Sequence, residues 1–128
     1  MRNLVLEALP LTLSVLRFAP DTKLDAAFIN ADGFLTITRS AEELSVVCES
    51  SKLPTTATEK VQADWKAFKV QGPLDFSLTG ILSAIAKPLA DNEVPIFAIS
   101  TFDTDYILVE GKNFTKAQNV LEQNFTVK

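Results

Sequence analysis

The chain has 128 residues, which is enough for one domain or two very small modules and too few for a large enzyme. Sixteen acidic against twelve basic side chains give a net charge of −4, the wrong sign for binding nucleic acid or an anionic membrane. The absence of histidine and the single cysteine, Cys48, exclude Ser-His-Asp and Cys-His catalysis, intrachain disulfides and zinc ribbons. We therefore expect a cytoplasmic protein that is not an enzyme and carries neither a metal nor a cofactor.

Residues 1–16 contain an apolar run, which Glu7 and Pro10 interrupt. No small-residue cleavage site follows the run, so we expect these residues to belong to the folded protein rather than to a signal peptide. No part of the sequence reaches the roughly eighteen consecutive apolar residues that a membrane-spanning helix needs. The sequence therefore predicts no association with a membrane.

The first half of the chain predicts strands with little helix between them. Alternating apolar and polar residues predict three strands, at residues 11–18, 34–39 and 44–49. Residues 24–33 predict at most a short helix or turn, which Gly33 closes. The charged residues 40–43 predict the turn of a hairpin. Residues 50–64 have few large apolar side chains and predict a connector to the second half.

The second half opens with a predicted strand and a predicted helix. Residues 65–70 favour a strand, and apolar residues at helical spacing over residues 78–89 favour a helix. Asp75 or Ser77 is expected to cap the start of this helix. Pro88 removes one backbone hydrogen bond near its end, so we expect the helix to bend or end there.

The remaining residues predict a hairpin followed by a second helix. Residues 94–101 (VPIFAIST) are apolar on both faces, which favours a central strand covered on both sides. Residues 103–111 form its hairpin partner. Apolar positions over residues 114–125 share one helical face, with Asn113 as the expected N-cap. A short last strand at residues 125–128 completes the pattern.

The second half therefore has the order strand, helix, strand, strand, helix, strand, which is that of a ferredoxin-like fold. The first half follows the same order with shortened or missing helices. We predict an α+β protein of tandem modules, each with an antiparallel sheet and helices on one face. The degenerate first module is placed at residues 1–60 and the complete second module at residues 61–128.

The two predicted hairpins align with one another. Residues 38–47 match residues 100–109 at an offset of 62, which pairs Glu43 with Asp105. Both acids then stand at the end of a hairpin turn, immediately before a strand. The alignment leaves open whether Glu43 marks a second site.

A glycine-containing turn precedes the predicted helix of the second half. Backbone amides at the start of a helix, here those of Thr79, Gly80 and Ile81, bind a carboxylate or a phosphate. Gly80 has a second explanation, because glycine also permits close packing between a helix and a strand. The pattern alone does not separate an anion site from this packing role.

The hairpin turn at residues 100–105 (STFDTD) contains two acids among hydroxyl-bearing residues. Carboxylates and turn carbonyls bind an ammonium or guanidinium group. Asp and Thr are also ordinary turn residues that need no ligand. In a ferredoxin-like fold this turn and the glycine turn come near one another, so an anion site and a cation site would face one zwitterion.

Other chemistry-bearing residues have structural explanations. For Trp65 a place in the core is favoured over a plug beside the connector or a part of a dimer surface. Cys48, on the apolar face of a strand, is expected to be a small buried side chain without a catalytic base. Carboxylates suit magnesium or calcium, but the acids of the two turns lack a DxDxDG-like spacing, so no metal site is predicted. These acids are Glu42, Glu43, Asp103 and Asp105.

At these motifs the sequence resembles the ACT-domain superfamily, specifically small bacterial tandem-ACT proteins related to the ACT domains of cytosolic arginine sensors and, more distantly, of aspartokinases. The resemblance rests on residues 72–109 (GPLDFSLTGILSAIAKPLADNEVPIFAISTFDTDYILV) and more loosely on residues 34–49 (FLTITRSAEELSVVCE). It implies paired ferredoxin-like modules that sense small ligands, usually amino acids, at an interface between modules and do not catalyse. Together the motifs and the resemblance place ligand binding at Asp75, Thr79, Gly80, Ile81, Ser100, Thr101, Phe102, Thr104 and Asp105.

Two departures from the family pattern refine this expectation. An acidic residue that the arginine sensors place in the glycine turn is Leu78 here, which argues against arginine as the ligand. The chain has only two modules, so a complete interface site is expected to need a second copy in a homodimer. Regulation would then act on a separate protein partner. The alternative is a protein–protein interaction module that keeps the ACT fold and binds no small ligand.

Overall fold

In the computed structural model, residues 4–72 and 79–128 are described, and they divide into two compact units. We call Leu11–Trp65 the inserted unit, and Met1–Pro10 together with Lys66–Lys128 the outer unit. The predicted modules, residues 1–60 and 61–128, divide the chain differently. The first ten residues belong with the second half, because the strand they contain pairs there.

The inserted unit is a small antiparallel sheet with little helix. In chain order its elements are β2 (Leu13–Phe18), α1 (Ala26–Ile29), β3 (Leu35–Arg39), β4 (Leu44–Glu49), the 3-10 helix η1 (Ser50–Lys52) and the first half of β5 (Lys60–Val70). The strands lie in the order β3-β4-β2-β5, and each neighbouring pair is antiparallel. This is the strand order of a ferredoxin-like fold whose second helix is reduced to the single turn η1.

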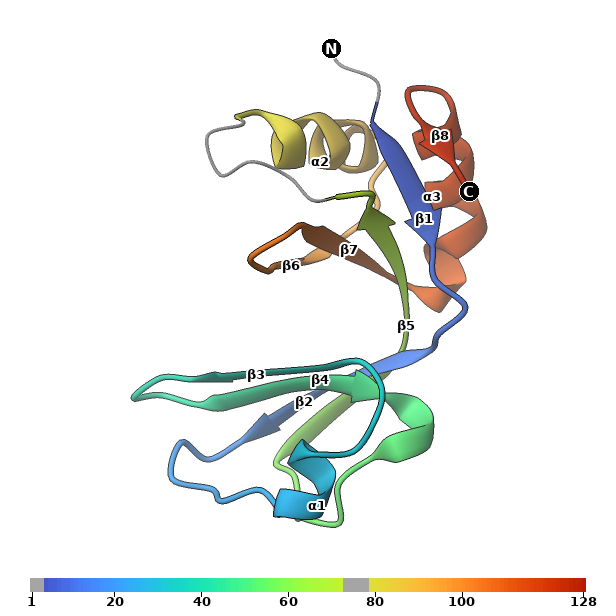
Figure 1. The fold of residues 1–128 in the computed structure, drawn as a ribbon. Coiled ribbons are helices and arrows are strands. Elements are labelled where there is room, and N and C mark those ends of the chain that lie inside the picture. Colours follow the sequence, from blue (N-terminus) through green and yellow to red (C-terminus); the bar gives the residue numbers. More distant parts are fainter. Residues whose placement is uncertain (1–3, 73–78) are drawn as a thin grey trace. The chain divides into compact units, whose positions relative to one another are not determined.

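The outer unit has two full helices on its sheet (Figure 1). Its elements are β1 (Val5–Ala8), the second half of β5, α2 (Ile81–Asp91), β6 (Phe97–Ser100), β7 (Asp105–Glu110), the 3-10 helix η2 (Gly111–Asn113), α3 (Phe114–Glu122) and β8 (Thr126–Val127). The strands lie in the order β6-β7-β5-β1-β8. The ferredoxin-like α+β prediction is confirmed, with β1 as an added strand between β5 and β8.

The pairing of β1 was not predicted from the sequence. Leu6 of β1 lies opposite Val70 of β5 in an antiparallel ladder, and opposite Val127 of β8 in a parallel one. Leu6 is fully buried. The four-residue strand has too short an alternation to indicate its partners, β5 and β8, which lie far along the chain.

One face of the outer sheet packs against both helices. Phe68, Val70, Ile107 and Val109 from β5 and β7 share a buried cluster with α2 and α3. The helices contribute Ile81, Ile85, Leu89, Ala117, Val120 and Leu121. The rings of Phe68 and Phe114 stack with centroids 5.3 Å apart. Full burial of each large aliphatic side chain contributes about 1.5–3 kcal/mol, so this cluster stabilises the unit.

The inserted unit has its own buried cluster, which contains Leu16, Phe18, Leu44, Val46 and Cys48. Phe28 of α1 packs against this cluster, together with Leu24 and Leu35. Gly33, after α1, has φ +116°, a conformation that L side chains rarely adopt. The expectation that this glycine closes the segment is therefore confirmed.

The segment predicted as a connector, residues 50–64, is only partly one. Residues 60–64 belong to β5, where Lys60 and Val61 lie opposite Arg17 and Leu16 of β2. Their side chains are exposed, so the apolar alternation that signals a strand is absent. At Asp64 the backbone has φ 65°, and the register of β2 against β5 shifts between Leu13 and Val15. This irregularity lies where β5 passes from one unit to the other.

The prediction of a central, doubly covered strand at residues 94–101 was wrong. β6 occupies only Phe97–Ser100 and, among the described strands, pairs with β7 alone, with alternate residues exposed. The apolar run does not indicate a buried strand, because its first part, residues 94–96, lies outside β6. Val94 is buried in the connection from α2, and Ile96 packs against the core beside it.

The helix ends also differ from expectation. Pro88 neither ends nor breaks α2, which continues to Asp91, because only one hydrogen bond of the last turn is lost. The Asn92 side chain donates to the Pro88 carbonyl at 2.8 Å and closes the helix. Asn113 stands at the N-cap position of α3 but makes no side-chain cap hydrogen bond. No helix among the described residues is long and apolar enough to cross a membrane.

Candidate functional site

The turn between β6 and β7 is closed by its own polar groups. Ser100 and Asp105 are the last paired residues of the ladder. The Thr101 amide donates to the Thr104 carbonyl at 2.8 Å, and the Thr101 hydroxyl donates to the same carbonyl at 3.1 Å. The Thr104 amide donates in return to the Thr101 hydroxyl at 3.3 Å. The turn conformation is therefore determined without any ligand.

Thr104 is a structural residue of this turn. Its side chain is 5% exposed, and its hydroxyl donates to the Val70 carbonyl at the end of β5. A buried carbonyl without a donor costs free energy, so this bond holds the turn against the central strand. The hydroxyl proton of Thr104 is consequently committed within the protein, although the resemblance placed Thr104 among the ligand contacts.

Asp105 is half-buried at the base of the turn. The Ser100 hydroxyl donates to its Oδ1 at 2.5 Å. Within the described residues only this oxygen of the carboxylate has a hydrogen-bond partner. Oδ2 therefore keeps its capacity to accept a hydrogen bond from a bound cation. Phe102, at the tip of the turn, is 79% exposed.

Helix α2 begins without a side-chain cap. Gly80 is its N-cap residue, with φ 77°, and its carbonyl accepts from the Ala84 amide at 2.9 Å. A Cβ placed on Gly80 would meet no described atom within 4 Å, so the close-packing explanation of this glycine is wrong and its left-handed conformation is the reason for it. Thr79 is exposed and Ile81 is buried. Asp75, the other residue predicted for this turn, lies outside the described residues.

The start of α2 and the β6–β7 turn lie at the same end of the outer unit (Figure 1). They come from segments separated by about twenty residues of helix and strand. The topology therefore brings the predicted anion-binding amides and the predicted cation-binding turn to one end of one unit.

Sequence reasoning missed a cleft on this unit. It has a volume of about 350 Å³ and is lined by Lys69, Gly72, Thr101, Asp103, Thr104 and Tyr106. The Lys69 ammonium lies 6.0 Å from the centroid of the Tyr106 ring. Lys69 lies between the buried Phe68 and Val70, and Tyr106 precedes the buried Ile107, so their half-buried positions on the opposite face of each strand were the available signal.

Two family models match the chain. A model of the ACT domain matches residues 60–123, which is half of the sequence and includes α2 and both strands of the hairpin. The chain belongs to the ACT-domain family. A second model, of an N-terminal domain, matches residues 14–56 of this ACT protein, within the inserted unit.

Curated relatives of this ACT protein include sensors. The human protein CASTOR3P is 29% identical over 105 residues, which cover 73% of this chain and 64% of that protein. The human cytosolic arginine sensor for mTORC1 subunit 1 is 30% identical over 98 residues, which cover 76% of this chain and 29% of the sensor. The chain thus spans less than two thirds of the length of either relative.

Solved structures show the same fold. An Agrobacterium tumefaciens protein has a TM-score of 0.88 and 31% identity, and the alignment covers 100% of this chain and 94% of that one. Escherichia coli aspartokinase III, solved with aspartate and ADP, has a TM-score of 0.60 and 13% identity over 94% of this chain and 32% of that one. The second likeness concerns the fold alone.

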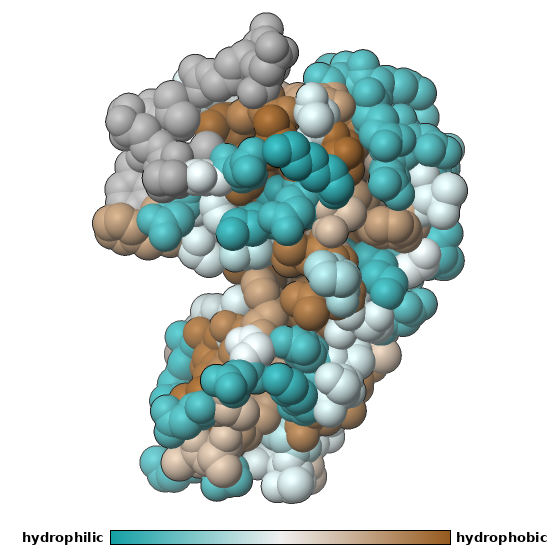
Figure 2. Space-filling model, turned by 45° about the vertical axis from the view of Figure 1, so that its right-hand side comes forward, coloured by the Kyte–Doolittle hydropathy of each residue, from teal (hydrophilic) through white to brown (hydrophobic). Residues whose placement is uncertain are grey.

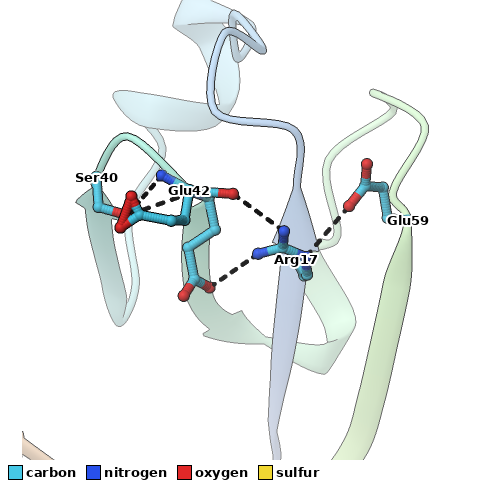
Figure 3. Close-up of polar contacts among 5 residues, drawn as sticks. Arg17, Ser40, Glu42 and Glu59 are labelled. Atoms are coloured by element: carbon cyan, nitrogen blue, oxygen red, sulfur yellow. Dashed lines mark hydrogen bonds and ion pairs between the residues drawn. The ribbon is translucent and has the colours of Figure 1, made fainter.

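The inserted unit of this ACT protein carries an ionic cluster at its own hairpin (Figure 3). The Arg17 guanidinium lies 3.4 Å from the Glu43 carboxylate and 3.2 Å from that of Glu59. It also donates to the Glu42 carbonyl at 3.0 Å. Glu43 therefore has an arginine of its own chain as partner, which favours a structural role over a second ligand site.

The described acidic and thiol groups were compared with the needs of a metal ion. Within the described residues, no three carboxylate or thiol groups lie close enough to hold a metal ion. Burial, followed by the neighbouring Glu49 carboxylate, raises the pKa of the Cys48 thiol. Cys48 is 2% exposed, and its thiol stays protonated at neutral pH. Its predicted place as a small buried side chain is confirmed.

Proposed function

We propose that this ACT protein is a cytoplasmic, non-catalytic regulatory module that binds an amino acid at an interface between ACT modules. The observation that carries the proposal is that the start of α2 and the β6–β7 turn lie at the same end of the outer unit. Membership of the ACT family and relatives named as arginine sensors support an amino acid as the ligand class. In this proposal the regulated target is a separate protein.

In this proposal two groups of atoms hold the ligand. The amides at the start of α2, around Gly80 and Ile81, bind the ligand carboxylate with help from the helix dipole. Oδ2 of Asp105 and the turn carbonyls bind the ammonium group. Each charge-assisted hydrogen bond contributes about 1.5–3 kcal/mol, so two or three of them, less the ordering costs, correspond to roughly micromolar affinity.

A second copy of the chain completes the site in this proposal. The residues at the α2 start and at the hairpin tip, including Thr79 and Phe102, are exposed, so they leave one side of the ligand open to water. A symmetric dimer places the same surface of the partner opposite. Light scattering after size exclusion should give twice the mass of the chain, and a monomer in the presence of saturating ligand would contradict this part.

The first test is a thermal-shift screen of the purified protein against the twenty amino acids. A ligand present at a hundred times its Kd adds about 2.7 kcal/mol to the free energy of unfolding. We expect one or two amino acids to raise the Tm. Asp105→Asn should abolish that rise while the unliganded protein stays folded, because the substitution keeps the shape of the side chain.

Asp21→Asn is the matched control, since Asp21 is exposed in the inserted unit and its substitution should leave the ligand response unchanged. A response that survives in Asp105→Asn would overturn the assignment of Asp105. A flat screen with all twenty amino acids would reject the sensor and leave the ligand-free interaction module, for which the exposed ring of Phe102 is a contact to test.

A further inference from the structure

We propose that the cleft bordered by Lys69, Thr101, Asp103 and Tyr106 is a second small-molecule site, which binds the α-ammonium and α-carboxylate groups of an amino acid through its own pair of charges. Lys69 binds the carboxylate, and Asp103 with Thr101 binds the ammonium group. The cleft shares the β6–β7 turn with the site of the proposed function, through Thr101 and Thr104, but its two charged residues, Lys69 and Asp103, do not belong to that site and no described residue of α2 lines it. It shares the ligand class with that function and rests on it to that extent.

Lys69 lies on the face of the sheet that the helices do not cover. Its neighbours in β5, Phe68 and Val70, point into the core formed with α2 and α3, and side chains alternate along a strand. Tyr106 alternates in the same way with the buried Ile107 on β7. The two side chains therefore project from neighbouring strands to one face, where the ammonium lies over the ring.

The charge of Lys69 is available for a ligand. Its cross-strand partner is Glu7 on β1, yet within the described part of the chain no carboxylate lies at ion-pair distance from the ammonium. The ammonium instead turns toward Tyr106, on the cleft side. A cation held beside an aromatic ring and facing a cleft is suited to a ligand carboxylate.

The opposite charge comes from the hairpin turn. Asp103 lines the cleft and is exposed, and its carboxylate accepts no hydrogen bond from a residue that the structure describes. The Thr101 hydroxyl donates to the Thr104 carbonyl and accepts from the Thr104 amide, which leaves one lone pair. An ammonium group can donate to that lone pair and to the Asp103 carboxylate together.

The size of the cleft agrees with a small ligand. About 350 Å³ lies at the lower end of the range for small-molecule sites, which suits an amino acid better than a nucleotide. With the carboxylate at Lys69 and the ammonium at the turn, the ligand side chain lies within the cleft that Tyr106 lines. The ring then favours an apolar or aromatic ligand side chain over a charged one.

Tyr106 supplies a direct probe, because it is the only tyrosine of the chain. Protein carrying ¹³C in the tyrosine ring gives a single set of ring resonances, and these report on the cleft. We expect at least one of the twenty amino acids to shift them in a saturable manner. The absence of any shift up to the solubility of each amino acid would overturn the proposal.

Substitutions then test the two charges. Lys69→Met and Asp103→Asn should each raise the Kd measured from the Tyr106 resonances by about tenfold or more, since each removes a charge-assisted bond. Lys116→Met, on the exposed surface of α3, is the matched control and should leave the Kd unchanged. An unchanged Kd in Lys69→Met would overturn the assignment.

Ligand analogues complete the test from the other side. For the amino acid that binds, the corresponding amine, which lacks the carboxylate, should bind the parent protein with a higher Kd. Lys69→Met should raise the Kd of this amine little further, because the substitution and the missing carboxylate delete the same contact. If the losses of binding free energy from Lys69→Met and from removal of the carboxylate were additive, contact between Lys69 and the carboxylate would be contradicted.

The two proposals fail separately. If Asp105→Asn abolishes the thermal shift while no amino acid moves the Tyr106 resonances, the proposed function stands and this site is wrong. If the Tyr106 resonances respond and the response depends on Lys69 but not on Asp105, the cleft is the ligand site and the site of the proposed function is wrong.

Discussion

The β3–β4 hairpin of the inserted unit and the β6–β7 hairpin of the outer unit share one main-chain plan. Arg39 and Leu44 close the first ladder, and Ser100 and Asp105, 61 positions later, close the second. In both turns the first residue donates its amide to the carbonyl of the fourth, at 2.9 and 2.8 Å. A 3-10 turn, η1 or η2, follows the second strand in both.

This correspondence corrects the sequence alignment by one residue. The predicted offset of 62 paired Glu43 with Asp105, whereas the ladder pairs and the turn hydrogen bonds agree at an offset of 61. Glu43 therefore corresponds to Thr104, and Asp105 to Leu44. Because side chains alternate along a strand, a shift of one residue exchanges the two faces, and the sequence offered no identical residues to exclude it.

Glu43 and Thr104, which correspond at the offset of 61, hold their turns to a central strand by different interactions. The fourth turn residue contacts the neighbouring central strand in both units, through Glu43 to Arg17 on β2 and through Thr104 to Val70 on β5. The first contact is a partly exposed ion pair and the second a buried hydrogen bond. Exposed ion pairs contribute little, whereas a buried group that loses its partner is costly, so the two turns differ in how strongly they are held.

The largest effect is expected for Thr104→Val. The substitution keeps the shape of the side chain but removes the donor to the buried Val70 carbonyl, which should lower the free energy of unfolding by about 1–3 kcal/mol. Urea unfolding followed by circular dichroism measures the loss. Native-state hydrogen exchange should locate it in the outer unit, and a stability equal to that of the parent would show that this bond does not hold the turn.

A smaller effect is expected for Glu43→Gln at the corresponding position. The ion pair with Arg17 is more than one-third exposed on both sides, so its loss should cost only about 0.2–1 kcal/mol. The cost should shrink further at high salt, which screens exposed charges. A double-mutant cycle with Arg17→Met isolates the pair, and a loss as large as that of Thr104→Val would contradict the contrast between the turns.

The smallest effect at neutral pH is expected for Cys48→Val, since the corresponding residue of the outer hairpin is Val109 and both are buried. The raised pKa of Cys48 means that the folded state holds the thiol proton more tightly than the unfolded state does. The parent therefore keeps its full stability below pH 9.0, the ordinary pKa of the thiol, and loses stability as pH rises toward the folded-state pKa.

Urea unfolding of parent and variant between pH 7 and 10 measures this difference. The stability lost above pH 9.0 should be no more than about 1.4 kcal/mol per pH unit and should be reduced in Cys48→Val. Thiol reagents should label Cys48 only after unfolding. Rapid labelling of the folded protein would show that the thiol is accessible, against its burial.

Exposed polar side chains on α3 explain why some elements were predicted correctly. Figure 2 shows hydrophilic side chains gathered on the α3 side of the outer unit, where Lys116, Asn119 and Glu122 are exposed. Their alternation with the buried Ala117 and Leu121 is a strong helical pattern. Elements with one buried and one exposed face were therefore predicted from the sequence.

By itself the sequence determined the strands with clear alternation, both long helices and the ACT family, and it supplied the candidate turn residues on which the proposed function rests. It determined these because local periodicity and turn chemistry depend on neighbouring residues. For the candidate site, the sequence proposed Gly80 and Asp105 but did not indicate the hydrogen bond of Thr104 to the Val70 carbonyl, which joins residues 34 positions apart.

Only the tertiary structure decided where β1 pairs, that β6 is an edge strand, that β5 extends back to Lys60, and that the hairpins correspond at an offset of 61. Each of these depends on backbone pairing between distant segments, which leaves no mark on side-chain pattern when the strand is short or exposed. The cleft beside Lys69 and Tyr106 was decided in the same way, because two neighbouring strands must first align before their polar side chains meet.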